Sequence, residues 1–319
     1  MDLGIIGHTK SISLAQALIE KKSRSYFFVG QTGIGKKTVA TALIRSLLCL
    51  ETGSEECQCQ SCSLFEKRTH PDFKYLVRDG KYFKIEQIHL LQKECSRRPK
   101  IGQYKAFLIA ETDKMTSRAA NALLKTLEEP PDYVFIFLIA QDANLVLPTI
   151  KSRCSVIKFK PLTEDAVKQV LEHKDFYGDL ELASKLSFGS VRKAISCISG
   201  TALDVRDRAL QLLVELSDYH IYRIFELGDS GVDALFVDFL QLLVYDLLAI
   251  KKEGTLKNID RAEELQNLAS KYTQEFLVQA IRRLVSFKNR SWFNINFPLH
   301  FSQLILELKA LNSKYKAVC

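Results

Sequence analysis

The chain has 319 residues, of which 47% are hydrophobic and 26% charged, a composition typical of a globular protein with about two domains. No apolar stretch reaches the ~18 uninterrupted residues of a membrane helix, and residues 1–10 lack the pattern of a secretory signal, so we expect a cytoplasmic protein without membrane segments. The net charge of +8 comes from the first half, where residues 1–160 hold 25 Lys and Arg against 16 Asp and Glu. This balance suits a phosphate-rich partner, although a solvated basic surface would explain it equally well.

Residues 1–161 alternate short apolar stretches with segments of helical periodicity, a pattern that predicts an α/β core with a parallel sheet covered on both faces. The expected strands are 26–29, 73–77, 104–110, 133–140 and 155–158, and the expected helices between them are 37–49, 85–97 and 118–127. The last of these helices ends before Pro130 and Pro131, because proline cannot continue a helix.

Pro161 marks a boundary, because no strand pattern recurs beyond it. Residues 162–201 are predicted to form short helices in a small lid, which begins with Thr163 as a helix N-cap followed by acids in the first turn. Residues 202–319 contain longer helices whose apolar residues recur three and four apart. We therefore expect three parts: an α/β core, a helical lid and an all-helical C-terminal domain.

A glycine-rich loop follows the first expected strand, in the segment Gly30 to Lys37 (GQTGIGKK). Phosphate-binding loops use glycines to turn backbone N–H groups toward phosphates, a lysine for the β- and γ-phosphates, and a Ser or Thr for Mg²⁺. The residues that match this pattern are Gly30, Gly33, Gly35 and Lys36. Lys37 stands at the metal-ligand position, and Thr38 is turned by roughly 100° from it on a helix, so it is no simple substitute.

An acidic tip on the strand 104–110 is the second element expected of a nucleotide hydrolase. In an active site this tip carries an Asp for the Mg²⁺ shell and then a Glu that orients the attacking water. By strand register Ala110 stands at the Asp position, while Glu111 remains. The residues at positions 37 and 110 thus predict a nucleotide-binding fold that does not hydrolyse ATP, and they leave weak nucleotide binding open.

Four of the eight cysteines lie within fourteen residues, between the first helix and the second strand: Cys49, Cys57, Cys59 and Cys62. Four thiolates make a closed tetrahedral site of the kind that binds structural zinc. Four reduced thiols without a metal are the alternative, but such a density of exposed thiols would be a liability. His70 is a weaker candidate ligand, because the four cysteines already fill the site.

The segment Ala120 to Pro131 (ANALLKTLEEPP), together with Ser152-Arg153-Cys154, closely resembles the clamp-loader branch of the AAA+ proteins, and specifically the δ′ subunits of bacterial DNA polymerase III. The resemblance covers residues 1–200 well and continues weakly to residues 293–301 (FNINFPLHF). It implies an AAA+ core, a lid and a collar-type oligomerisation domain within a five-subunit arc. This arc opens the ring-shaped sliding clamp and loads it on primed DNA. The implied partners are the γ/τ motor subunits and δ, and δ′ is similar to a rigid stator among them.

The resemblance also implies roles for single residues. Arg153 matches an arginine finger that reaches the ATP of a neighbouring motor subunit, and Arg192 matches a lid arginine that senses nucleotide in active relatives, with a purely structural role as the alternative. The four cysteines match the position of a zinc module at 49–62. This chain departs from that module, because one residue instead of two separates Cys57 from Cys59.

Two other functions remain in competition with a stator. A catalytic ATPase similar to γ/τ is weakened by Lys37 and Ala110, each of which removes a metal-shell group. A DNA-binding protein that acts alone is supported only by the basic first half.

Overall fold

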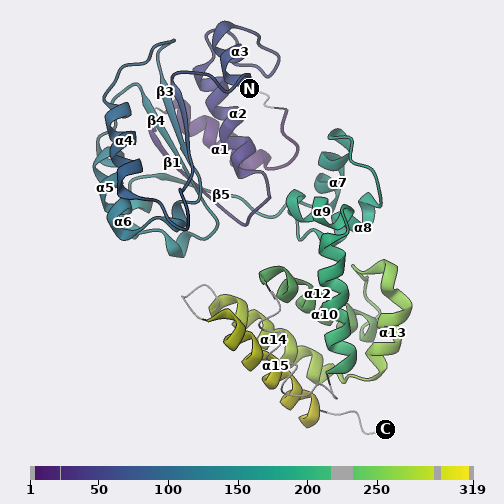
Figure 1. The fold of residues 1–319 in the computed structure, drawn as a ribbon. Coiled ribbons are helices and arrows are strands. Elements are labelled where there is room, and N and C mark those ends of the chain that lie inside the picture. Colours follow the sequence, from purple (N-terminus) through teal and green to yellow (C-terminus); the bar gives the residue numbers. More distant parts are fainter. Residues whose placement is uncertain (1–3, 22, 217–232, 291–295, 316–319) are drawn as a thin grey trace. The chain divides into compact units, whose positions relative to one another are not determined.

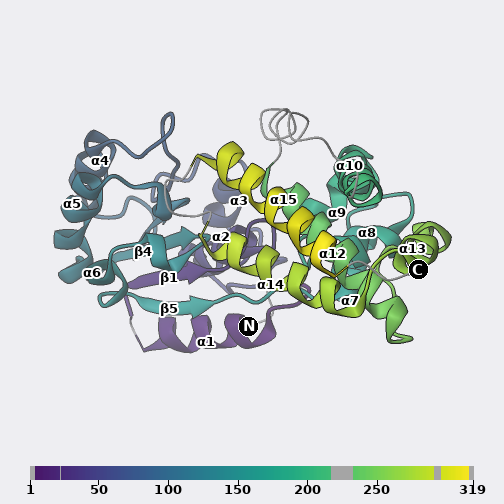
Figure 2. The same cartoon turned by 90° about the horizontal axis from the view of Figure 1, so that it is seen from below.

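The computed structural model describes residues 4–21, 23–216, 233–290 and 296–315. The chain forms two compact units, one of residues 1–170 with 188–192 and one of residues 171–187 with 193–319. The first unit is an α/β core and the second is helical, so the predicted fold class is confirmed (Figures 1 and 2). The division at residues 161 and 201 stays a prediction. Among the described residues, no helix has the length and apolar character that crossing a membrane requires.

The first unit is built on a five-stranded parallel sheet with the strand order β2-β3-β4-β1-β5. Its strands are β1 (Ser25–Val29), β2 (Phe73–Leu76), β3 (Lys105–Ile109), β4 (Val134–Ala140) and β5 (Ser155–Lys158). Every residue of β1, β3 and β4 is buried, as expected for inner strands covered on both faces. The strands therefore agree with the predicted positions to within one residue at either end.

Helices cover both faces of the sheet (Figure 1). One face packs on α1 (Thr9–Glu20), α2 (Lys36–Leu48) and α3 (Gln60–Glu66), and the other on α4 (Ile85–Cys95), α5 (Ser117–Glu128) and the short α6 (Pro148–Lys151). Alternate strand residues serve the two cores: Tyr26 and Phe28 face the first, and Phe27 and Val29 the second. Helices α1, α3 and α6 were not predicted from the sequence.

The second unit consists of helices within the described residues. They are the last three residues of α7 (Glu164–His173), most of α9 (Val191–Ile198), and α8 (Leu180–Leu186), α10 (Thr201–Glu215), α12 (Ala234–Lys251), α13 (Ala262–Ser270), α14 (Gln274–Arg290) and α15 (Phe297–Lys314). Phe239, Leu243 and Leu247 of α12 are fully buried, which confirms the predicted apolar face. Asn296 caps α15 by accepting a hydrogen bond from the backbone of Leu299, whereas residues 293–295 lie outside the described part of the chain.

Candidate phosphate-loop and metal sites

The glycine-rich loop lies between the end of β1 and the start of α2, as predicted. Gly33 and Gly35 have φ angles of 79° and 102°, in the left-handed region that favours glycine. A side chain at Gly33 would collide with Ser190, and one at Gly30 would collide with the carbonyl oxygen of Phe159. The backbone of the loop and its close neighbours therefore require these glycines.

Lys36, the first residue of α2, folds its amine back into the loop. Its Nζ donates hydrogen bonds to the carbonyl oxygens of Gly30 and Gln31, the latter at 2.7 Å, and the residue is only 6% exposed. Burial lowers the pKa of Lys36 to about 8; the Asp113 carboxylate opposes this shift and the Arg192 guanidinium adds to it. The lysine of the loop is thus already engaged by protein carbonyls.

Residues 188–192 cover the loop and belong to the same compact unit. Ser190 Oγ donates a hydrogen bond to the carbonyl oxygen of Thr32 at 2.9 Å. The backbone and Cβ of Arg192 lie beside Gly33. The structure therefore brings the backbone and Cβ of Arg192 next to the phosphate loop, and its role toward nucleotide stays a prediction.

Lys37 and Ala110 stand at the two positions where the sequence analysis expects Mg²⁺ ligands in an active site. Lys37 extends over the ring of Tyr75 on β2, with its Nζ 3.9 Å from the ring centroid. Thr38 lines a hollow on α2 together with Thr41. Lys37 itself carries no hydroxyl that could serve as a metal ligand at the start of this helix.

Two acids follow β3 and lie in different surroundings. Glu111 forms an ion pair with Arg78, whose Nε lies 2.6 Å from Glu111 Oε2. Asp113 accepts a hydrogen bond from the backbone N–H of Gln141 at 3.3 Å, and its second oxygen is buried without a partner among the described residues. Burial raises the pKa of Asp113, and its charge acts on Lys36. Asp113 is therefore the acid whose charge acts on the lysine of the phosphate loop.

Arg153 lies just before β5 and is held by two neighbouring elements. Its Nε donates to Glu128 Oε1 at 2.7 Å, its Nη2 donates to the same oxygen, and its Nη1 donates to the carbonyl oxygen of Thr149 at 3.0 Å. The side chain is one-third exposed. Nη1 also donates to Ser152 Oγ at 3.4 Å, so four of the five guanidinium N–H groups are used and one remains for another acceptor.

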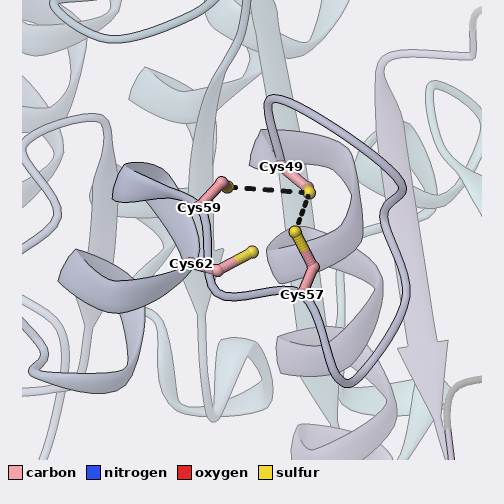
Figure 3. A group of neighbouring side chains, drawn as sticks. All are labelled: Cys49, Cys57, Cys59 and Cys62. Atoms are coloured by element: carbon pink, nitrogen blue, oxygen red, sulfur yellow. Dashed lines mark hydrogen bonds between the residues drawn. The ribbon is translucent and has the colours of Figure 1, made fainter.

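The four cysteines gather beyond the C-terminal end of α2, and Figure 3 shows their thiols pointing toward one another. Cys49 caps the end of α2, Cys59 caps the start of α3, and Cys62 lies in the first turn of α3. All four sulfur atoms lie within 4.8 Å of one another; the Cys49 sulfur is 3.5 Å from that of Cys57 and 3.8 Å from that of Cys59. A tetrahedral site with metal–sulfur bonds of ~2.3 Å places its sulfurs about 3.8 Å apart. The donor set therefore fits one tetrahedral metal ion.

Backbone N–H groups support the thiols as ligands. Gly53 N donates to the Cys49 sulfur at 3.2 Å. Burial opposes ionisation of Cys59, yet hydrogen bonds from the backbone of Cys62 and Leu50 lower the pKa of its thiol to about 6. Burial raises the pKa of Cys62. A bound cation would favour the thiolate form of all four cysteines.

Comparison with known proteins identifies the family. A family model described as "DNA polymerase III, delta subunit" matches residues 8–163, and one described as "DNA polymerase III, delta subunit, C terminal" matches residues 203–310. The two matches together span most of the chain. The chain belongs to the family of DNA polymerase III clamp-loader subunits.

Two relatives from Bacillus subtilis show how the similarity is distributed within this family. DNA polymerase III subunit δ′ is 29% identical over 91% of the chain and 92% of the relative's own length. DNA polymerase III subunit τ is 24% identical over 90% of the chain, but the match spans only 57% of τ. Among solved structures, a γ-subunit-related protein from Thermotoga maritima aligns over 94% of the chain and 99% of its own, with 18% identity and a TM-score of 0.43.

Sequence reasoning missed three groups at these sites of the clamp-loader subunit. Glu128 lies inside the diagnostic ANALLKTLEEPP segment, yet nothing in the sequence pairs it with Arg153. Asp113 follows Glu111 by two residues, and an acid so close to a buried strand end is a usable signal. The contact of Ser190 with the phosphate loop joins residues 158 positions apart and has no local signal.

Proposed function

We propose that the chain is a δ′-like stator subunit of a DNA polymerase III clamp loader, which supports ATP-driven loading of the sliding clamp on primed DNA and supplies Arg153 in trans. One observation carries this proposal: Arg153 and the chain's own phosphate loop lie at opposite ends of the strands of the sheet. Ser155 at the start of β5 pairs with Tyr26 at the start of β1, so Arg153 precedes the strands, while Lys36 follows them. A guanidinium at that end of the strands is remote from its own loop and suits a phosphate on another subunit.

The chain's own loop supports the stator over a motor. Lys36 is held by carbonyl oxygens, and Lys37 is turned onto Tyr75. Ala110 offers no carboxylate to a metal. Because phosphoryl transfer depends on charge stabilisation by Mg²⁺, the chain alone is proposed not to hydrolyse ATP.

The catalytic alternative, a subunit similar to γ/τ, is favoured by the 24% identity to τ and by the intact glycines and Lys36. It lacks both metal-shell side chains, so it ranks second. A DNA-binding protein acting alone ranks third, because only the basic balance of residues 1–160 supports it. Cytoplasmic location stays a prediction from the sequence.

We also propose that Cys49, Cys57, Cys59 and Cys62 bind one structural zinc ion. The sulfur spacing supports this proposal despite the short Cys57–Cys59 step. Zinc is the ion of choice for four thiolates in a closed site. When bound, it would fix the segment between α2 and α3, which has few apolar residues of its own.

The proposed partners are the γ/τ motor subunits and δ in a hetero-oligomer, with the sliding clamp and primed DNA reached through the complex. The test is to mix the purified chain with γ/τ and δ from one bacterium and to measure the mass of the product. A complex with one copy of this chain is expected, and the chain alone should show no ATP turnover that Lys36→Ala abolishes. Failure to enter any complex, or turnover that depends on Lys36, would refute the stator.

A further inference from the structure

A buried chain of hydrogen bonds connects the cysteine cluster to the sheet. His70, just before β2, is only 4% exposed, and its Nδ1 accepts a hydrogen bond from the backbone N–H of Asp72 at 3.1 Å. The neutral ring therefore carries its proton on Nε2, which lies 2.9 Å from Ser61 Oγ. Ser61 in turn donates to the carbonyl oxygen of Leu48 at 2.6 Å. Each donor in this series of hydrogen bonds has one acceptor, so the donor and the acceptor of every bond are fixed.

Two residues of this series of hydrogen bonds, Leu48 and Ser61, lie next to the proposed metal ligands in the sequence. Leu48 immediately precedes Cys49, and Ser61 lies between Cys59 and Cys62. The Ser61 bond to Leu48 therefore joins the end of α2 to the start of α3, the two helix ends that carry three of the four thiols. His70 fixes the orientation of the Ser61 hydroxyl from the opposite side.

Arg45 holds the backbone at Cys57, the fourth cysteine of the cluster. It lies one helical turn before Cys49 on α2, and its side chain is 13% exposed. Its Nη1 donates to the carbonyl oxygen of Ser54 at 2.7 Å and its Nη2 to that of Cys57 at 2.8 Å. Glu66 on α3 accepts from the same Nη2 at 3.0 Å, so Arg45 links the loop, α2 and α3.

Arg45 also brings charge to the cluster. Four thiolates around one divalent cation carry a net charge of −2, which is costly to bury without a compensating cation. Its hydrogen bonds to the carbonyl oxygens of Ser54 and Cys57 hold the Arg45 guanidinium beside the cluster. The guanidinium therefore neutralises part of the charge that a metal-bound cluster would hold.

We infer that Arg45 and the Ser61–His70 pair are positioning residues that preorganise the four cysteines for a tetrahedral metal ion. His70 is a support for the site and not a ligand of it. This inference rests on the metal site proposed above. Partners of this kind orient ligands, and their loss typically costs about 10–100-fold in metal affinity.

The test uses the full chain loaded with zinc and compares conservative variants with matched controls. Ser61→Ala removes only the hydroxyl, and Arg45→Lys keeps the charge but loses the planar fork. Ser63→Ala on the same helix and Arg68→Lys on the exposed surface are the controls. Zinc affinity is measured by competition with a chromophoric chelator, and thermal unfolding is measured with and without zinc.

We expect Ser61→Ala and Arg45→Lys each to weaken zinc binding about 10-fold or more, with both controls within twofold of wild type. The rise in melting temperature on zinc binding should shrink in the two variants, whereas a purely structural defect would lower the melting temperatures of the zinc-loaded and zinc-free proteins equally. If both melting temperatures fall equally, or if the zinc affinities match those of the controls, the inference is overturned. If the wild type binds no zinc, the proposed metal site itself fails, which is a separate result. Should one variant not fold, the other decides.

Discussion

The two ends of helix α2 differ in how completely they keep the side chains of the site that each one carries. At its start, the phosphate loop keeps the glycines and Lys36, but Lys37 and Ala110 stand where the sequence analysis expects Mg²⁺ ligands in an active site. Just beyond its end, all four cysteines of the metal cluster are present with tetrahedral spacing, even though one step between them is short. In the proposed function, the phosphate loop thus keeps its backbone without its metal chemistry, whereas a zinc site that contributes folding energy keeps all of its ligands.

The largest expected effect concerns the cysteine end. Cys59→Ser should remove the zinc ion and loosen the segment between Cys49 and Cys62, because a structural zinc ion contributes roughly 10 kcal/mol or more of apparent binding energy. Metal analysis and proteolysis of this segment provide the measurement. Cys197→Ala in the helical unit loses a buried thiol elsewhere and should keep the ion. Wild-type protein purified without chelator and free of zinc would reverse the comparison.

At the phosphate end, restoring the missing groups should repair the loop. The double variant Lys37→Ser with Ala110→Asp should bind ATP on the order of tenfold more tightly in the presence of Mg²⁺, because the restored hydroxyl and carboxylate would let the metal ion bridge the loop and the phosphates. Binding of a fluorescent ATP analogue with and without Mg²⁺ measures this effect. Equal Mg²⁺-dependent affinity in the wild type would mean that the loop has lost nothing.

The buried amine of Lys36 predicts a pH dependence of stability. Its pKa falls from 10.5 to about 8 on folding, so the folded state binds fewer protons within that window, and stability rises with pH there and is constant below it. The unfolding free energy of the wild type relative to Lys36→Met should rise by roughly 1–2 kcal/mol from pH 8 to 10.5, after allowance for solvent screening. Urea unfolding at both pH values measures it. If the difference in unfolding free energy between the wild type and Lys36→Met does not change with pH, the Lys36 amine is solvated in the folded state.

The smallest expected effect concerns the support of Arg153. Glu128→Gln should lower ATP hydrolysis at the one site that Arg153 serves by about two- to fivefold, because an exposed ion pair contributes ~0.2–1 kcal/mol. The neighbouring exposed Glu129→Gln is the matched control and should change nothing. Hydrolysis rates of loaders reconstituted with each variant provide the comparison, and equal rates for the two would remove any role of Glu128 in orienting the finger.

Much of the fold was predictable because the inner strands of a parallel sheet are continuous apolar runs, as in β1 and β4. Helix α3 escaped prediction because its seven residues lie within the cysteine segment and are too few for a clear periodicity. At the sites, the glycines, Lys36 and the cysteines were predictable from their spacing. The pairing of Arg153 with Glu128 was not, because side chains 25 residues apart meet only through tertiary packing.

The central claim is that Arg153 of this subunit acts on the ATP of a neighbouring subunit, while the subunit's own phosphate loop hydrolyses no ATP. The most direct measurement compares DNA-stimulated ATP hydrolysis and clamp loading by loaders that contain Arg153→Ala or Lys36→Ala in this chain alone. Arg153→Ala should slow hydrolysis at the one site it serves by roughly 10³-fold, so total turnover falls in part, while Lys36→Ala should leave both rates unchanged. Wild-type rates with fully incorporated Arg153→Ala, or a loss of turnover with Lys36→Ala, would contradict the account.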